Sequence, residues 1–128
     1  MNELLLGIDI GTSGCKVTVI DRRGNIVDTA FGEYRNLHPH PGWSEQDPDD
    51  WYRVASALLR DVMAGGKCRP EQIAALSLDG STHNAVLADG DFRPLRPAIM
   101  WTDQRSAPQA ARLEAEAGSQ IFRIGYQK

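Results

Sequence analysis

The first third of the chain contains three short runs of apolar residues, which predict three strands. These runs cover residues 4–10, about 16–20 and about 26–34. Apolar runs of this length, bounded by turn residues, are typical of buried strands. Residues 21–25, with the sequence DRRGN, have the chemistry of a tight turn between the second and third runs. The pattern therefore predicts a three-stranded meander.

A helical pattern follows the meander. Asp47 suits the N-cap and Pro48 suits the first helical position, and two acidic residues then face the positive end of the helix dipole. Gly65 and Gly66 predict its end. Its apolar residues recur at helical spacing and form one face: Trp51, Val54, Ala55, Leu58, Leu59 and Val62.

The remainder of the chain alternates between strand and helix patterns. Residues 73–78 and 84–88 predict strands, and a short apolar segment covers residues 98–101. A last helix is expected over about 106–117, ended by Gly118. Three antiparallel strands followed by a helix and a buried strand indicate a layered α/β domain. Periodicity alone does not distinguish among the folds of that class.

Composition places the chain among ordinary soluble globular domains. It has 128 residues, 41% hydrophobic and 24% charged, which fits one domain with a modest core. The net charge of −3 argues against a broad surface for nucleic acid or anionic membranes. The N-terminal apolar run lacks a basic n-region, and the two cysteines are far apart, so we expect a cytoplasmic protein with free thiols.

The first strand leads directly to a candidate phosphate site. Asp9 lies near its end, and Gly11, Thr12, Ser13 and Gly14 follow. Glycines let backbone N–H groups approach a ligand closely, the hydroxyls add donors, and a carboxylate beside them suits Mg²⁺. The alternative is that Asp9 caps its own turn. The mixture of glycine, hydroxyl and carboxylate favours the phosphate interpretation.

Two later segments could contact a ligand. Thr82 and His83 follow a predicted strand, where a polyol hydroxyl or the nearby backbone could be the partner of the imidazole. Trp101, Asp103 and Arg105 could form an apolar wall and polar contacts for a sugar. From sequence alone, a core tryptophan, a helix N-cap and a solvated arginine are the favoured interpretation of these three.

Two histidines, His38 and His40, lie in a polar loop that is rich in proline. They lack further ligands of the kind that a zinc site requires, so a surface loop is favoured over a metal site. Trp43 and Glu45 are expected to pack and to fix this loop.

Four blocks together resemble the N-terminal part of the FGGY family of carbohydrate kinases, in particular its xylulokinase-like pentulose kinases. They are GIDIGTSG at 7–14, GWSEQDP at 42–48 running into Trp51, LSLDGSTH at 76–83 and LRPAIMWTDQR at 95–105. The first block is weak evidence by itself. The four in this order span nearly the whole chain.

The resemblance implies a ribonuclease-H-like fold, shared with actin-type ATPases, and transfer of phosphate from ATP to a sugar hydroxyl. It implies that Asp9 lies near the Mg²⁺ and that residues 11–14 contact the transferred phosphate. It also implies that Thr82, His83, Trp101 and Asp103 line the sugar pocket. Xylulokinases usually have a Gln-Met-His type sequence at 81–83, so the departure here leaves the sugar open.

Family enzymes are several times longer than this chain, and their catalytic base and adenine-binding domain lie in later segments. Residues 1–128 are therefore expected to be the N-terminal portion of the first kinase domain, inactive in isolation. The exposed edge of such an incomplete sheet leaves a monomer or a homodimer as alternatives.

Two other functions compete with the kinase. A small ribonuclease-H-like nuclease or resolvase could use Asp9 and Asp79 as paired metal ligands. Against it, the acidic balance argues against binding nucleic acid, and the Trp43 and Trp101 segments would have no role. A non-catalytic sugar-binding module would fit the length but would leave the phosphate loop without a function.

Overall fold

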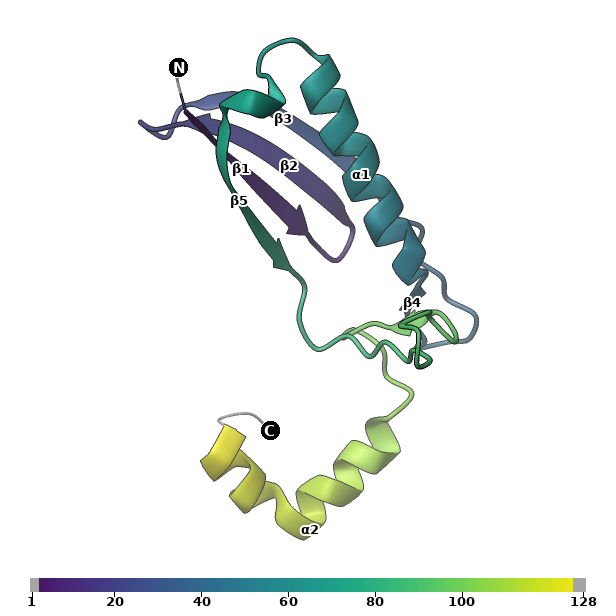
Figure 1. Cartoon of the computed structure of the whole chain (residues 1–128). Helices are drawn as coiled ribbons and strands as arrows, with labels where there is room; N and C mark the ends of the chain where they lie inside the picture. The colour runs from purple at the N-terminus through teal and green to yellow at the C-terminus, as the bar shows by residue number, and fades with distance from the viewer. Residues whose placement is uncertain (1–2, 126–128) are drawn as a thin grey trace.

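The computed structural model describes residues 3–125 (Figure 1). Its strands and helices follow one another as β1 (Leu4–Ile10), β2 (Gly14–Asp21), β3 (Ile26–Glu33), β4 (Glu45–Gln46), α1 (Pro48–Ala64), the 3₁₀ helix η1 (Pro70–Gln72), β5 (Ile73–Gly80), β6 (Ala98–Ile99) and α2 (Ala107–Gly125). The predicted meander, the helix after Asp47 and the strand beginning at residue 73 are confirmed.

The main sheet has the strand order β3-β2-β1-β5. Its first three strands are antiparallel, and β5 runs parallel to β1, a connection that needs a crossover such as the one α1 supplies. The register places Asp9 opposite Lys16 on one side and opposite Asp79 on the other. Charged residues from three strands therefore meet near one end of the sheet.

The core lies between α1 and one face of the sheet, and in Figure 1 α1 lies beside β2 and β3. Asp47 accepts a hydrogen bond from the backbone N–H of Asp49 at 3.0 Å, which confirms the predicted N-cap. Both cysteines are free and buried, and burial raises the pKa of the Cys15 thiol. The buried apolar positions of the sheet and of α1 include Leu4, Leu6, Ile8, Val17, Val19, Val54, Leu58 and Val62.

The prediction of a strand over residues 84–88 is wrong. That segment makes isolated bridges, Ala85 to Ile99 and Ala88 to Pro94, and forms one side of an arm of residues 85–99 that turns back at residues 89–93. The opposing segment contains Pro94 and Pro97, which have no backbone N–H to donate to a ladder. A strand with an apolar pattern still needs a partner that can pair along its length.

The prediction that Gly118 ends the last helix is also wrong, because α2 continues to Gly125. A glycine inside a helix costs only about 1 kcal/mol relative to alanine, so it weakens a helix without having to end it. None of the residues of α2 is buried, and the helix stands apart from the sheet in Figure 1. Among the described residues, no helix is both long and apolar enough to cross a membrane.

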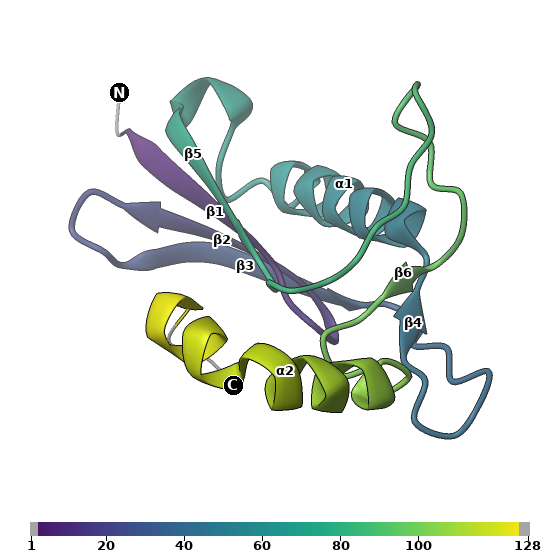
Figure 2. The ribbon, with the colours of Figure 1, turned by 90° about the horizontal axis from the view of Figure 1, so that it is seen from below.

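The small sheet of β4 and β6 lies at the N-terminal end of α1, as seen from below in Figure 2. Glu45 pairs with Ile99, and Gln46 pairs with Ala98. This pairing brings the segment before α1 against the segment that carries Trp101. The segments that the sequence analysis identified separately thus meet at one end of the main sheet.

Candidate functional site

Residues 11–14 form the tight turn from β1 into β2, and Gly14 is the first residue of β2. The backbone N–H of Gly11 donates to the carbonyl of Gly14 at 3.0 Å, and Tyr34 donates to the carbonyl of Ser13 at 3.2 Å. Within the part of the chain that the structure describes, the N–H groups of Thr12 and Ser13 make no hydrogen bond. Unpartnered backbone N–H groups in a tight loop are suitable donors to phosphate.

Asp9 is exposed, and because its strand neighbour Ile8 is buried in the core under α1, Asp9 lies on the opposite face of the sheet. It lines a depression of about 300 Å³ together with Lys16, Ser77 and Asp79. Residues 3–125 contain no group of three or more His, Cys, Asp or Glu side chains placed to hold a metal. Mg²⁺ typically binds through one or two carboxylates, with water and substrate phosphate as its other ligands, so Asp9 fits that role.

Trp101 joins the loop to the later segments. Its indole Nε1 donates to Oγ1 of Thr12 at 3.0 Å, and its backbone N–H donates to Oδ1 of Asn84 at 2.9 Å. Asn84 in turn donates to Oγ of Ser81 at 2.7 Å. With 57% of its surface exposed, Trp101 is not the core residue that the sequence alone favoured. Its ring is available to a ligand.

Thr82 and His83 lie next to this chain of contacts and are both exposed. Oγ1 of Thr82 and Nδ1 of His83 are 2.9 Å apart, which leaves Nε2 as the ring nitrogen not engaged by Thr82. His83 has a φ of 62°, in the left-handed region that glycine favours. Strained backbone of this kind is concentrated at functional sites, which fits the predicted ligand contact.

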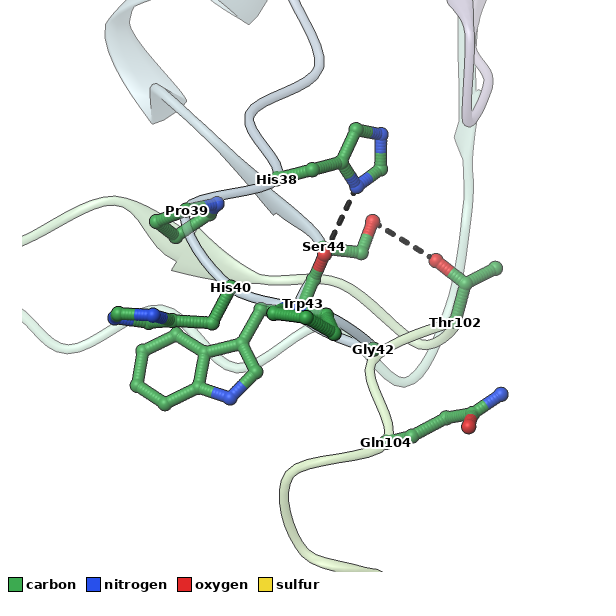
Figure 3. Close-up of a pocket in the computed structure, with 9 residues that line it drawn as sticks. His38, Pro39, His40, Gly42, Trp43, Ser44, Thr102 and Gln104 are labelled. Carbon is green, nitrogen blue, oxygen red and sulfur yellow. Dashed lines mark hydrogen bonds between the residues drawn. The ribbon is translucent and has the colours of Figure 1, made fainter.

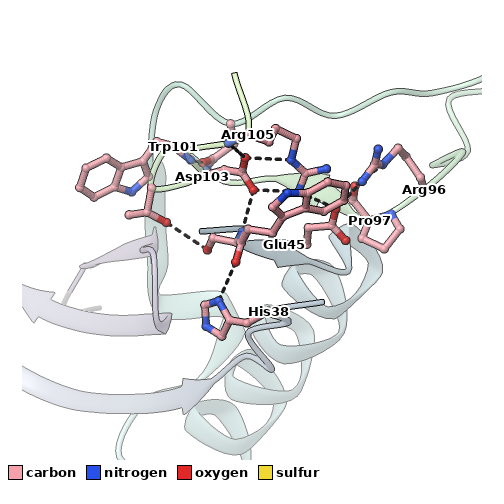
Figure 4. Close-up of polar contacts among 11 residues, drawn as sticks. His38, Glu45, Arg96, Pro97, Trp101, Asp103 and Arg105 are labelled. Carbon is pink, nitrogen blue, oxygen red and sulfur yellow. Dashed lines mark hydrogen bonds and ion pairs between the residues drawn. The ribbon is translucent and has the colours of Figure 1, made fainter. Parts of the chain in front are cut away.

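Asp103 lies inside a polar cluster with Glu45, Arg96 and Arg105, shown in Figure 4. Its carboxylate accepts from the backbone of Ser44 at 2.7 Å and from Arg105 at 2.7 and 2.8 Å. Hydrogen bonds from the Arg105 guanidinium hold the pKa of Asp103 well below its usual range. Glu45 accepts from both arginines.

This cluster corrects two interpretations made from sequence. Asp103 does not cap a helix, since α2 begins at Ala107, and Arg105 is not solvated, since its side chain is only 15% exposed. A contact between Asp103 and a sugar stays a prediction. The carboxylate is already used to hold Ser44 and Arg105, so it also fixes the segment that follows Trp101.

Trp43 packs against the same arginine from the other side. The guanidinium carbon of Arg105 lies 3.6 Å from the centroid of the Trp43 ring. The rings of His40 and Trp43 pack edge to face, with their centroids 4.6 Å apart. Figure 3 shows the loop of residues 38–44 around a pocket of about 550 Å³. Nδ1 of His38 donates to the carbonyl of Trp43 at 2.8 Å. The predicted surface loop is confirmed, with packing as the role of Trp43.

Gln46 and Asn84 are two residues that sequence reasoning did not assign to the site. Gln46 is fully buried and its amide touches the loop of residues 11–14. The sequence signal for Gln46 was its position, because it is a polar amide immediately before Asp47, the N-cap of α1. Asn84 carried no distinctive signal, because its role depends on Trp101, 17 positions later.

Comparison with known proteins identifies relatives over nearly the whole chain. A sequence model described as "FGGY family of carbohydrate kinases, N-terminal domain" matches residues 4–125. A xylulose kinase from Escherichia coli (strain K12) is 38% identical over 112 residues, which is 88% of this chain and 23% of that protein. A glycerol kinase from Methylorubrum extorquens (strain PA1) is 36% identical over 124 residues, 96% of this chain and 25% of the relative.

The solved structures agree with this result. A crystal structure described as a xyloylose kinase from Brucella ovis matches with a TM-score of 0.85 and 39% identity, covering 95% of this chain and 25% of that one. These neighbours confirm the predicted fold class, the ribonuclease-H-like fold of actin-type ATPases. The chain spans about a quarter of the length of the curated relatives it matches.

Proposed function

Because the chain belongs to the FGGY family of carbohydrate kinases, we propose that residues 1–128 are the N-terminal portion of an ATP-dependent sugar kinase. The kinase would transfer the γ-phosphate of ATP to a hydroxyl of a pentulose-type, xylulose-like sugar. Its partners are ATP, Mg²⁺ and the sugar, and no nucleic acid or membrane is involved. The closely related alternative is a glycerol-type substrate, given the glycerol kinase among the relatives.

One observation carries this proposal: the hydrogen bond from Trp101 to Thr12. It joins a loop with free N–H donors to a segment with an exposed aromatic ring. A phosphoryl transfer needs the acceptor hydroxyl and the phosphate to lie within reaction distance of each other. A sugar packed on Trp101 and contacted by His83 would lie next to a phosphate bound by residues 11–14.

Each predicted residue has a chemical task in this arrangement. Asp9 would hold Mg²⁺, which neutralises charge on the phosphates when it is bound. The amides and hydroxyls of residues 11–14 would bind the transferred phosphoryl group. Thr82, His83, Trp101 and Asp103 would bind and orient the sugar. A base that removes the proton of the attacking hydroxyl is expected from a later segment of a complete kinase.

The decisive experiment is a chimera in which this chain replaces the segment that it matches in the Escherichia coli xylulose kinase. We expect the chimera to phosphorylate xylulose with MgATP and the isolated chain to be inactive. A folded but inactive chimera, or turnover of ATP and a pentulose by the isolated chain, would contradict the proposal. Glycerol and a panel of pentuloses, tested in parallel, determine the substrate class.

A further inference from the structure

We propose that Gln46 is a positioning residue that holds the loop of residues 11–14 in the conformation that receives a phosphoryl group. The inference rests on the proposed kinase function. Gln46 ends β4 and none of its surface is exposed. A buried amide must find its hydrogen-bond partners inside the protein, because leaving it unpaired costs free energy. The partners of this amide point to its task.

The orientation of the Gln46 amide follows from the chemistry of those partners. Nε1 of Trp51 donates to Oε1 of Gln46 at 2.7 Å. An indole N–H can only donate, so the oxygen of the amide must face Trp51 and its nitrogen must face the opposite way. That nitrogen donates to the backbone oxygen of Thr12 and to Oδ1 of Asn36, both at 2.6 Å. Both N–H bonds are used, and the amide has one orientation.

Fixing the Thr12 carbonyl also fixes the next N–H group. In a trans peptide the carbonyl of one residue and the N–H of the next point in opposite directions. The Thr12 carbonyl points toward the buried Gln46, so the N–H of Ser13 points away from it. Without Gln46 this peptide could rotate and present its carbonyl, whose partial negative charge would repel a phosphate.

Gln46 thereby anchors the loop of residues 11–14 to α1. Trp51 lies in the first turns of α1 and packs against the core. Gln46 connects that helix to the backbone of Thr12, while Trp101 holds the Thr12 side chain from another direction. Thr12 is therefore held by both its carbonyl and its hydroxyl.

Two substitutions in the chimera test this role. Gln46→Met keeps the length of the side chain and removes every hydrogen bond. We expect kcat to fall by about tenfold to 100-fold, because a displacement of about 1 Å in a reacting group can slow a reaction by about that much. The change in KM for the sugar should be smaller. Gln46→Glu keeps the acceptor for Trp51 but can donate to Thr12 only when its carboxyl is protonated. Its kcat should therefore rise relative to that of Gln46→Met as the pH is lowered.

The control is Val62→Ala, which opens a cavity at the far end of α1, where Val62 is 2% exposed. It should lower Tm without lowering kcat by more than about twofold. Equal losses of kcat in Val62→Ala and Gln46→Met would overturn the proposal. So would a pH profile of Gln46→Glu that is parallel to that of Gln46→Met.

A second measurement separates this inference from the proposed function. In the 128-residue chain itself, NMR order parameters of the Thr12 and Ser13 amides should fall in Gln46→Met and stay unchanged in Val62→Ala. An inactive chimera with the native Gln46 would contradict the kinase function. Unchanged order parameters in Gln46→Met would overturn the role of Gln46, whatever the chimera does.

Discussion

The indole nitrogen of Trp101 and the hydroxyl of Thr12 are 3.0 Å apart, across 89 positions of sequence. This bond connects the loop between β1 and β2 to the segment after β6. Neither segment alone contains both the proposed phosphate-binding residues and the proposed sugar-binding residues. Their contact places the two sets of proposed residues side by side, and it is the first relationship to test.

Thr12→Val and Trp101→Phe each remove this bond from one end while keeping the side chain's approximate shape. Because Trp101 is 57% exposed, we expect a coupling free energy of only about 0.5–1 kcal/mol in a double-mutant cycle of urea unfolding. In the chimera, each substitution should lower kcat/KM about tenfold. A double variant that loses activity as the product of the two single losses would contradict a direct role for the bond.

Asp9→Asn separates a functional carboxylate from a structural one. Asp9 is exposed and lies in register with the like-charged Asp79, so stability should change by no more than about 0.5 kcal/mol. Kinase activity of the chimera should fall about 100-fold or more. Glu71→Gln, which also removes one exposed negative charge, is the matched control and should leave activity intact. A large loss of stability in Asp9→Asn would instead favour a turn-capping role.

The fold was predictable where the determinants are local. The turn at residues 21–25, the N-cap Asp47 and the apolar face of α1 are short-range signals, and the elements that they predict are present. The failures have a different origin. Residues 84–88 needed a partner strand, and the length of α2 was not determined by Gly118. Sequence patterns indicate which conformations a segment favours and carry little information about what lies beside it.

The same distinction applies to the site. Asp9 and residues 11–14 lie within six consecutive positions, so they could be proposed as one site from the sequence alone. The cluster of Glu45, Asp103 and Arg105 joins positions 60 residues apart. It reverses the interpretation of Arg105 as a solvated charge, since a buried guanidinium requires carboxylate partners that only the fold brings together.

The Asp103 carboxylate should make the free energy of unfolding depend on pH in the acidic range. Its pKa is held below its usual value of about 3.9 by Arg105, so its stabilising contribution is present above about pH 4 and is lost as the pH falls further. Asp103→Asn should lower Tm at neutral pH by about 5 °C or more. In this variant the free energy of unfolding should also fall less steeply as the pH is lowered.

The pH dependence of the unfolding free energy must be compared between Asp103→Asn and the native chain, because other carboxylates also contribute to acid unfolding. The pKa values of Asp21 and Asp28 are lowered by hydrogen bonds from Asn25 and Lys67, and both residues remain in the variant. Urea unfolding between about pH 5 and about pH 2 gives both profiles. Parallel profiles would show that Asp103 titrates as an ordinary surface carboxyl.

Gly14 and Gly7 should respond in opposite directions to alanine. A Cβ at Gly14 would clash with the carbonyl of Gly32 and lie 2.7 Å from the Phe31 ring, so Gly14→Ala should destabilise the chain by about 1–3 kcal/mol. A Cβ at Gly7 would meet nothing within 4 Å. Gly7→Ala should stabilise by about 0.5–1 kcal/mol, because alanine loses less entropy on folding. Thermal and urea unfolding provide the values.

That pair of variants also clarifies why Gly14 is a glycine. The strand partner at Gly32 already excludes a side chain there, so the predicted phosphate contact is not needed to explain the residue. If Gly14→Ala were as stable as the native chain, the packing explanation would be wrong and close approach of a ligand would remain as the reason.

His83 and Phe92 provide a matched test of strain against function. Both are non-glycine residues in the left-handed region, with φ of 62° and 61°. Substitution of either by glycine should relieve strain and change stability by about 1 kcal/mol or less, in the same direction for the two sites. Phe92 is 90% exposed in the turn of residues 89–93 and is not among the residues proposed to contact the sugar.

Sugar binding should separate the two variants. His83→Gly removes the imidazole that the proposed site uses and should raise KM for the sugar in the chimera by about tenfold or more. Phe92→Gly should leave KM unchanged. Because the backbone change is the same, a loss confined to His83→Gly assigns the effect to the imidazole. Equal losses in both variants would mean that the left-handed backbone, rather than the side chain of His83, determines the activity.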